Sequence, residues 1–153
     1  SILLEMELRA LVATTIQPVC LPESPDLLIE DFLPSHLVMP LCDLVIIHGG
    51  QGSVQTAIAA GVPLIGIPLQ PEQNTNLRLV ERQGAGRCLS LRDLKRGKLR
   101  IAVEKLLRDS SYRKSMARLQ GWQAGRDGEV EAAREICWLV KGQSPVQRLA
   151  PLD

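Results

Sequence analysis

Residues 44–53 read Leu-Val-Ile-Ile-His-Gly-Gly-Gln-Gly-Ser. The four apolar residues favour a buried strand, the glycines favour a tight turn, and residues 54–60 favour a helix that Gly61 ends. A strand, a glycine-rich turn and a helix in this order form an anion site. Glycine lets backbone N–H groups approach a phosphate closely, and the helix N-terminus adds partial positive charge. We therefore expect this segment to bind a phosphorylated ligand.

The segments on either side of this turn alternate between strand and helix. Apolar runs and turn residues predict strands over 27–29, 44–47, 64–67 and 88–91, and helices over 37–41, 53–60 and 74–83. Short apolar strands joined by helices are typical of a parallel sheet with helices on both faces. The predicted fold class is therefore α/β, with a Rossmann-like sheet.

The two ends of the chain have different patterns. Residues 2–11 have the periodicity of an amphipathic helix, and a short β-prone segment follows over 12–16. The C-terminal part is predicted to be wholly helical, with helices over 99–107, 112–120 and 130–140. Residues 142–153 lack periodicity. We expect one domain over residues 1–141 and a tail over 142–153.

The composition limits the class of protein. A chain of 153 residues with 45% hydrophobic residues can bury one substantial core. Eighteen basic and seventeen acidic residues leave a net charge of +1, which argues against nucleic acid as the main partner. The basic run over 92–100 is predicted to be a solvated loop and helix start. Residues 1–11 carry acidic residues and lack a cleavage pattern, so we expect no signal peptide and a cytoplasmic location.

Cysteine usage argues against a metal site or redox chemistry. The four cysteines, Cys20, Cys42, Cys88 and Cys137, lie far apart and form no C-x-x-C pair. Their spacing fits buried free thiols in a reducing compartment better.

A second polar segment follows the next predicted strand. Residues 68–76 read Pro-Leu-Gln-Pro-Glu-Gln-Asn-Thr-Asn. Parallel strands all end at one edge of a sheet, so this segment should lie beside the glycine-rich turn. Glu72 and Gln73 offer a carboxylate acceptor and an amide with both donor and acceptor, which suit the vicinal hydroxyls of a sugar. A phosphate-type loop beside a hydroxyl-type loop favours a nucleotide sugar as the ligand.

Each of these residues also has a purely structural interpretation. His48 could be a strand-end histidine that bonds to the backbone, and Ser53 could cap the following helix. Glu72 and Gln73 could simply belong to the favoured first turn of a helix. Gly50-Gln51-Gly52 also resembles the start of a dinucleotide fingerprint, but the third glycine position is occupied by Gln55, which weakens that interpretation.

Several motifs together resemble the donor-binding half of nucleotide-sugar glycosyltransferases with the two-domain GT-B architecture. They are Asp43 to Ser53, Ala59 to Pro63, Pro68 with Glu72-Gln73, Asn76, and Gly84 to Gly86. The chain is most similar to the macrolide and UDP-glycosyltransferase group. The resemblance covers roughly residues 27–90, and the helices up to about residue 140 fit the C-terminal domain of that family.

The resemblance implies a role for each matched position. The donor diphosphate would be held by His48, Gly50, Gln51, Gly52 and Ser53, and the sugar hydroxyls by Glu72 and Gln73. The base and ribose would lie against Phe32, Leu33, Ser35 and Thr56. Here the chain departs from the family pattern, since Phe32 replaces the common tryptophan, Ser35 the common glutamine, and Thr56 the ribose-binding glutamate of plant members.

The resemblance also implies an activity. A hexose-type sugar would move from a UDP- or TDP-sugar to an acceptor hydroxyl with inversion, without a metal or other cofactor. We identify no catalytic base in this chain, and we expect His36 to be a surface residue. The base and the small-molecule or lipid acceptor site are expected in an N-terminal domain, and the family's first donor-domain strand would precede Ser1.

Two other functions stay open at this stage. The chain could be a nucleotide-sugar-binding subunit of a split transferase. A dinucleotide-binding oxidoreductase module is the weaker alternative. If a partner domain normally covers one face of this chain, that face would be apolar, and we expect the isolated chain to self-associate.

Overall fold

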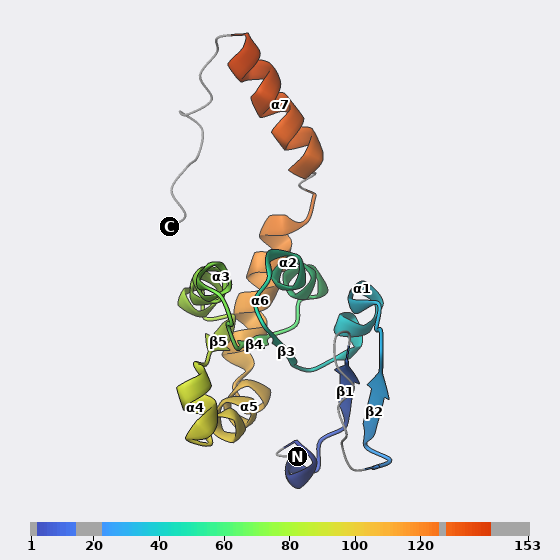
Figure 1. The fold of residues 1–153 in the computed structure, drawn as a ribbon. Helices are drawn as coiled ribbons and strands as arrows, with labels where there is room; N and C mark the ends of the chain where they lie inside the picture. The colour runs from blue at the N-terminus through green and yellow to red at the C-terminus, as the bar shows by residue number, and fades with distance from the viewer. Residues whose placement is uncertain (1–2, 15–22, 126–127, 142–153) are drawn as a thin grey trace. The chain divides into compact units, whose positions relative to one another are not determined.

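A computed structural model describes residues 3–14, 23–125 and 128–141 (Figure 1). The described residues form two compact units, one up to Gly121 and one from Trp122 onward. The predicted tail over 142–153 lies outside the described residues, as do Cys20 and the last two residues of the β-prone segment predicted over 12–16.

The strands of the first unit are all parallel. β1 (Ala10–Ala13) pairs with β2 (Leu27–Glu30), and β3 (Val45–Ile47), β4 (Leu64–Gly66) and β5 (Gly86–Cys88) form a second sheet in that order. All three residues of the central strand, β4, are buried. The predicted parallel α/β architecture is confirmed, although the described strands form two separate hydrogen-bonded sheets instead of one.

The helices occupy most of the remaining described chain. They are η1 (Leu4–Met6), α1 (Ser35–Val38), η2 (Met39–Leu41), α2 (Gln51–Ala60), α3 (Pro71–Arg82), α4 (Leu91–Lys95), α5 (Lys98–Arg108), α6 (Ser110–Gln123) and α7 (Gly128–Val140). Gly61, with a φ of 69°, ends α2 in the left-handed conformation that glycine adopts readily. Pro71 opens α3 at a position where the missing N–H costs nothing.

Helices cover both faces of the three-stranded sheet, as predicted. Leu64 and Ile65 are adjacent on β4 and fully buried, and they point to opposite faces. Leu64 packs in a cluster with residues of α2, α3 and α6, whereas Ile65 packs with residues of α5 and with Tyr112. Figure 1 shows α2 and α3 on one side of this sheet and α4 and α5 on the other.

The prediction of an N-terminal helix over 2–11 is wrong. The described part of this segment contains only the short η1 helix and then β1, which begins at Ala10. Leu11 and Val12 pair with Leu28 and Ile29 of β2, and the burial of β1 alternates from residue to residue. Pairing with a strand that lies far along the chain overrides the local helical periodicity.

Several predicted boundaries move by two or three residues. α2 begins at Gln51 instead of residue 53, and α3 begins at Pro71 instead of residue 74. β5 ends at Cys88, because Ser90 caps α4 by accepting a hydrogen bond from the N–H of Asp93 at 3.2 Å. The first turns of both α2 and α3 therefore lie closer to the strand ends than the sequence suggested.

We predict that the packing of α3 on the sheet is a main source of stability. Leu77→Ala should lower the free energy of unfolding by roughly 2–5 kcal/mol, because Leu77 is 1% exposed and its loss leaves a cavity. Leu79→Ala on the same helix is the matched control. Its side chain is 55% exposed, so the change should stay within about 0.5 kcal/mol. Urea denaturation followed by circular dichroism measures both, and equal losses would contradict this packing.

Candidate ligand-binding site

The turn after β3 lies directly against α3. Gly49 has a φ of 90°, and a Cβ atom at this position would lie 2.5 Å from Leu77 and 3.0 Å from the carbonyl oxygen of Gln73. Only glycine fits both the backbone conformation and the space. The turn can therefore approach α3 closely at the carboxyl end of β3, the edge where open α/β sheets bind ligands.

The N-terminus of α2 has no side-chain cap. Gly50 occupies the N-cap position, so the alternative in which Ser53 caps this helix is wrong, and Ser53 lies in the first turn. The first N–H of α2 with a backbone acceptor is that of Val54, which donates to Gly50 O at 3.1 Å. The N–H groups of residues 51–53 have no acceptor among the described residues. Such a helix start can hold an anion.

His48 lies next to these amides. Its side chain is exposed, and its Nε2 atom would be 2.7 Å from a Cβ atom placed on Gly50. The imidazole therefore lies over Gly50, at the entrance to the uncapped turn. A Cβ atom on Gly52 would meet nothing within 4 Å, so the space beside Gly52 in the first turn is open. His48 and the uncapped start of α2 thus lie close together.

In the second predicted loop, some of the polar groups already form hydrogen bonds within the protein. Gln73 is 8% exposed, and its Oε1 accepts hydrogen bonds from the N–H groups of Leu69 at 2.8 Å and Gln70 at 3.2 Å. These bonds fix the start of α3 and leave only the amide nitrogen of Gln73 for a ligand. Glu72 is exposed in the same turn.

Asn76 joins the two loops. Its Nδ2 donates to Gly49 O at 3.1 Å and to Oε1 of Glu72 at 2.8 Å. One amide therefore holds the glycine-rich turn and orients the Glu72 carboxylate. The sequence pattern indicated Asn76 only as part of the family resemblance. The signal for its structural role was its spacing of four residues from Glu72, which places both side chains on one face of a helix.

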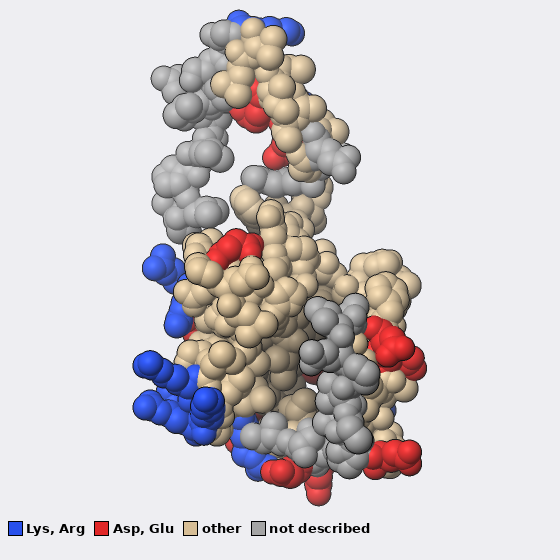
Figure 2. Space-filling model, in the orientation of Figure 1, with Lys and Arg blue, Asp and Glu red and all other residues tan. Residues whose placement is uncertain are grey.

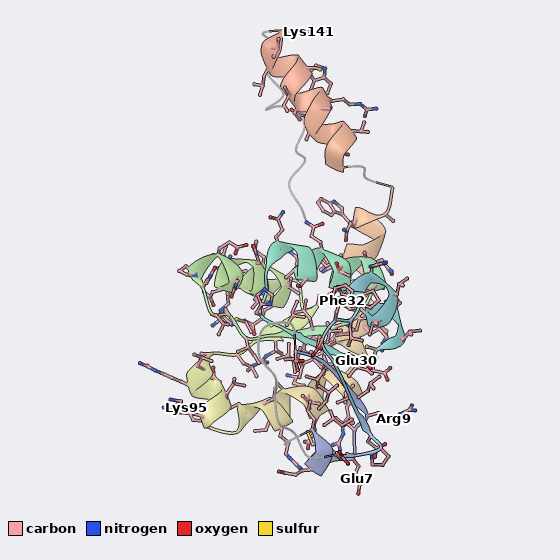
Figure 3. The ribbon with its side chains drawn as sticks, turned by 45° about the vertical axis from the view of Figure 1, so that its right-hand side comes forward. Glu7, Arg9, Glu30, Phe32, Lys95 and Lys141 are labelled. Carbon is pink, nitrogen blue, oxygen red and sulfur yellow. The ribbon has the colours of Figure 1, made fainter. Side chains whose placement is uncertain are left out.

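The predicted base and ribose residues lie on neighbouring elements. Phe32 follows β2 and is 73% exposed, and Ser35 is the first residue of α1, which packs against α2 (Figure 3). Leu33 is half-buried. The hydroxyl of Thr56 donates to Gly52 O at 2.9 Å within α2. The structure therefore places the predicted base segment beside α2, the helix whose start is uncapped.

Other features of the described residues lie outside this site. Cys42, Cys88 and Cys137 are free, and burial raises the pKa of the Cys42 and Cys88 thiols, which makes them poor nucleophiles. No group of His, Cys, Asp and Glu side chains in the described ranges could hold a metal ion. No helix there is long and apolar enough to cross a bilayer. A hollow of about 330 Å³ lies between η1 and α5, away from the turn.

Comparison with known proteins gives a consistent match. Residues 13–138 match the family model described as erythromycin biosynthesis protein CIII-like, C-terminal domain. A curated relative, 4'-demethylrebeccamycin synthase of Lentzea aerocolonigenes, is 37% identical over 130 residues, which are 84% of this chain and 31% of that protein. The chain thus spans about a third of the length of this relative.

Solved structures show the same fold. The calicheamicin glycosyltransferase CalG4 is 31% identical, with a TM-score of 0.68 over 79% of this chain and 32% of that one. The spinosyn rhamnosyltransferase SpnG complexed with thymidine diphosphate is 24% identical, with a TM-score of 0.67 over 76% of this chain and 32% of that one. At this identity, the likeness to SpnG shows the fold alone.

We predict that Asn76→Ala loosens the glycine-rich turn. Backbone amides over residues 49–53 should exchange with solvent faster, because the turn loses its hydrogen bond to α3. Thr75→Ala is the control, since the one hydrogen-bond partner of the Thr75 hydroxyl among residues 3–14, 23–125 and 128–141 is Pro71 O of its own helix. Hydrogen exchange measured by mass spectrometry tests this. Unchanged exchange in the Asn76 variant would show that the bond does not hold the turn.

Proposed function

This chain belongs to the glycosyltransferase family of the erythromycin biosynthesis protein CIII-like C-terminal domain, and we propose that it binds the nucleotide-sugar donor of such an enzyme. The observation that carries the proposal is the uncapped start of α2, tied through Asn76 to the exposed carboxylate of Glu72. An anion-binding helix end beside a carboxylate matches a ligand that contains both phosphate and hydroxyl groups. The family match favours this function over the oxidoreductase alternative.

The diphosphate would lie at the start of α2. The N–H groups of Gln51, Gly52 and Ser53 point out of the first turn of this helix, and the Ser53 hydroxyl adds a donor. Gly50 leaves room for the phosphate to approach the backbone, and His48 lies over it. Together with the helix dipole, these donors would stabilise the negative charge of a nucleoside diphosphate leaving group in place of a metal ion or other cofactor.

The sugar would lie toward α3. Glu72 is held by Asn76 through Oε1, so its Oε2 can accept hydrogen bonds from sugar hydroxyls. The Oε1 of Gln73 is already bonded to backbone N–H groups, so Gln73 would act as a donor to a hydroxyl oxygen through its amide nitrogen. The Glu72 carboxylate would therefore act as an acceptor and the Gln73 amide only as a donor, whereas the sequence suggested that the amide could do both.

The base and ribose would lie toward α1. The exposed ring of Phe32 offers a surface on which a pyrimidine can stack, beside Leu33 and Ser35. Thr56 uses its hydroxyl hydrogen on Gly52 O, which leaves the hydroxyl oxygen as an acceptor for a ribose hydroxyl. We place the nucleoside here because α1 packs on the helix whose start would hold the diphosphate.

The reaction would be direct displacement. An acceptor hydroxyl attacks the anomeric carbon of a hexose from the face opposite the diphosphate, a new C–O bond forms, and the bond to the diphosphate breaks with inversion. The bonding electron pair leaves with the nucleoside diphosphate. The acceptor proton passes to a base in another part of the enzyme. We expect the enzyme to act in the cytoplasm. The donors at the start of α2 lower the barrier by binding the departing charge.

We predict that His48→Ala weakens the binding of thymidine or uridine diphosphate by roughly tenfold, because one hydrogen bond to a charged phosphate is lost. His36→Ala is the matched control, since His36 is an exposed histidine of α1 outside the turn. Isothermal titration calorimetry on the folded chain measures both. No binding of either diphosphate to the unchanged chain would count against the proposal.

We predict that Glu72→Gln lowers the affinity for a nucleotide sugar much more than the affinity for the nucleoside diphosphate alone. The amide oxygen can still accept from Asn76, so the turn stays in place and the affinity for thymidine diphosphate should change less than about twofold. The affinity for a TDP-hexose should fall roughly fivefold to tenfold, because the hydrogen bonds to the carboxylate weaken. An equal loss of affinity for both ligands would show that the substitution disturbs the fold of the loop and does not act through sugar recognition.

A further inference from the structure

The charged residues of the first unit are strongly segregated. Residues 1–77 contain one Lys or Arg and eight Asp or Glu, whereas residues 78–118 contain thirteen Lys or Arg and four Asp or Glu. The net charge of +1 for the whole chain hides this separation. Figure 2 shows basic side chains gathered on one side, over the region that carries α4 and α5 in Figure 1.

The basic surface is centred on α4 and α5. Residues 91–108 contain seven Lys or Arg and two Asp or Glu, and both acidic side chains have partners within this segment. Asp93 binds Lys98 at 2.6 Å, and Glu104 lies 3.9 Å from Arg100. The basic side chains without an ion pair to any described residue include Arg92, Lys95, Arg96 and Arg108. This surface therefore has an uncompensated positive charge, and Figure 3 shows Lys95 extending outward from α4.

Apolar side chains are exposed among these cations. Leu91 is 53% and Ile101 is 66% exposed. A hollow of about 170 Å³ opens beside them, lined by the basic residues Arg87, Lys98 and Lys105 and the apolar residues Leu89, Ile101 and Ala102. Cations around an apolar floor suit a negatively charged group attached to a hydrocarbon chain.

We propose that the surface formed by Arg87, α4 and α5 docks this domain onto an anionic lipid bilayer. Basic side chains near a negatively charged bilayer are attracted to it, and exposed aliphatic side chains can enter the boundary between headgroups and acyl chains. The acidic residues of the first 77 positions would be repelled, so the charge separation also orients the domain. Residues 91–108 contain no Phe, Tyr or Trp on which nucleic acid bases could stack, which favours lipid over single-stranded nucleic acid.

This docking is independent of donor binding. The surface follows β5, whereas the uncapped helix start follows β3. A peripheral attachment of this kind would bring the enzyme close to acceptors that partition into the membrane. The proposed docking would place the transferase at the membrane surface, and it uses none of the residues assigned to donor binding.

Co-sedimentation of the whole 153-residue chain with lipid vesicles tests the proposal. The chain should bind vesicles of phosphatidylcholine mixed with phosphatidylglycerol, and it should bind vesicles of pure phosphatidylcholine at least tenfold more weakly. Lys95→Glu combined with Arg96→Glu should reduce binding to the anionic vesicles roughly tenfold or more. Arg9→Glu combined with Lys114→Glu changes the net charge by the same amount at exposed positions outside α4 and α5, and should have a much smaller effect.

A third variant tests the apolar part of the surface. Ile101→Ser should weaken vesicle binding severalfold without altering the thermal unfolding temperature, because Ile101 is exposed. Equal losses in the two double variants, or equal binding to both kinds of vesicle, would overturn the proposal. The proposal would also be overturned if the chain did not bind the vesicles and this surface instead bound a single-stranded oligonucleotide. Dimerisation through this surface in gel filtration, without vesicle binding, would overturn it as well.

Discussion

The close approach of α3 to the ends of β3 and β4 is the constraint on which the rest of the structure depends. Leu77 fills the space that side chains at Gly49 and Gly66 would occupy, so glycine at both positions lets the helix lie directly on the strand ends. The neighbouring Asn76 then reaches the carbonyl oxygen of Gly49. Core packing and site geometry are therefore set by adjacent residues of one helix, and neither can change without the other.

This arrangement leaves backbone N–H groups free for a ligand at the start of α2, whereas polar side-chain atoms in the first turn of α3 are already hydrogen-bonded. Gly50 has no side chain to cap α2, and the first amides of this helix stay open for an anion. In the first turn of α3, by contrast, the oxygen of Gln73 is bound to backbone N–H groups, and one oxygen of Glu72 is bound to Asn76. The proposed site is therefore pre-organised: a diphosphate would meet free backbone donors, and a sugar would meet an oriented carboxylate.

The sequence predicted those features that depend on short-range patterns. The strand over 44–47, the glycine-rich turn and the following helix form one contiguous segment, so apolar runs and glycines were sufficient. The helix over 2–11 was wrong, because β1 owes its conformation to pairing with β2. The hydrogen bond from Asn76 to Gly49 O was beyond prediction, since it requires α3 to lie beside a turn 27 residues away in the sequence. The burial of Gln73 was also not predicted, because it depends on how α3 packs. From the sequence, the basic run over 92–100 was predicted to be only a solvated loop and helix start, because opposite charges elsewhere cancel it in the total.

The central claim is that the start of α2 holds the diphosphate of a nucleotide sugar. Amide correlation spectra of the isotope-labelled chain, recorded during a titration with thymidine diphosphate, test it residue by residue. The account predicts that the largest shifts occur at the amides of Gly50, Gln51, Gly52 and Ser53, with smaller shifts near Phe32. Saturable shifts confined to the basic residues of α4 and α5, with none in the turn, would contradict it.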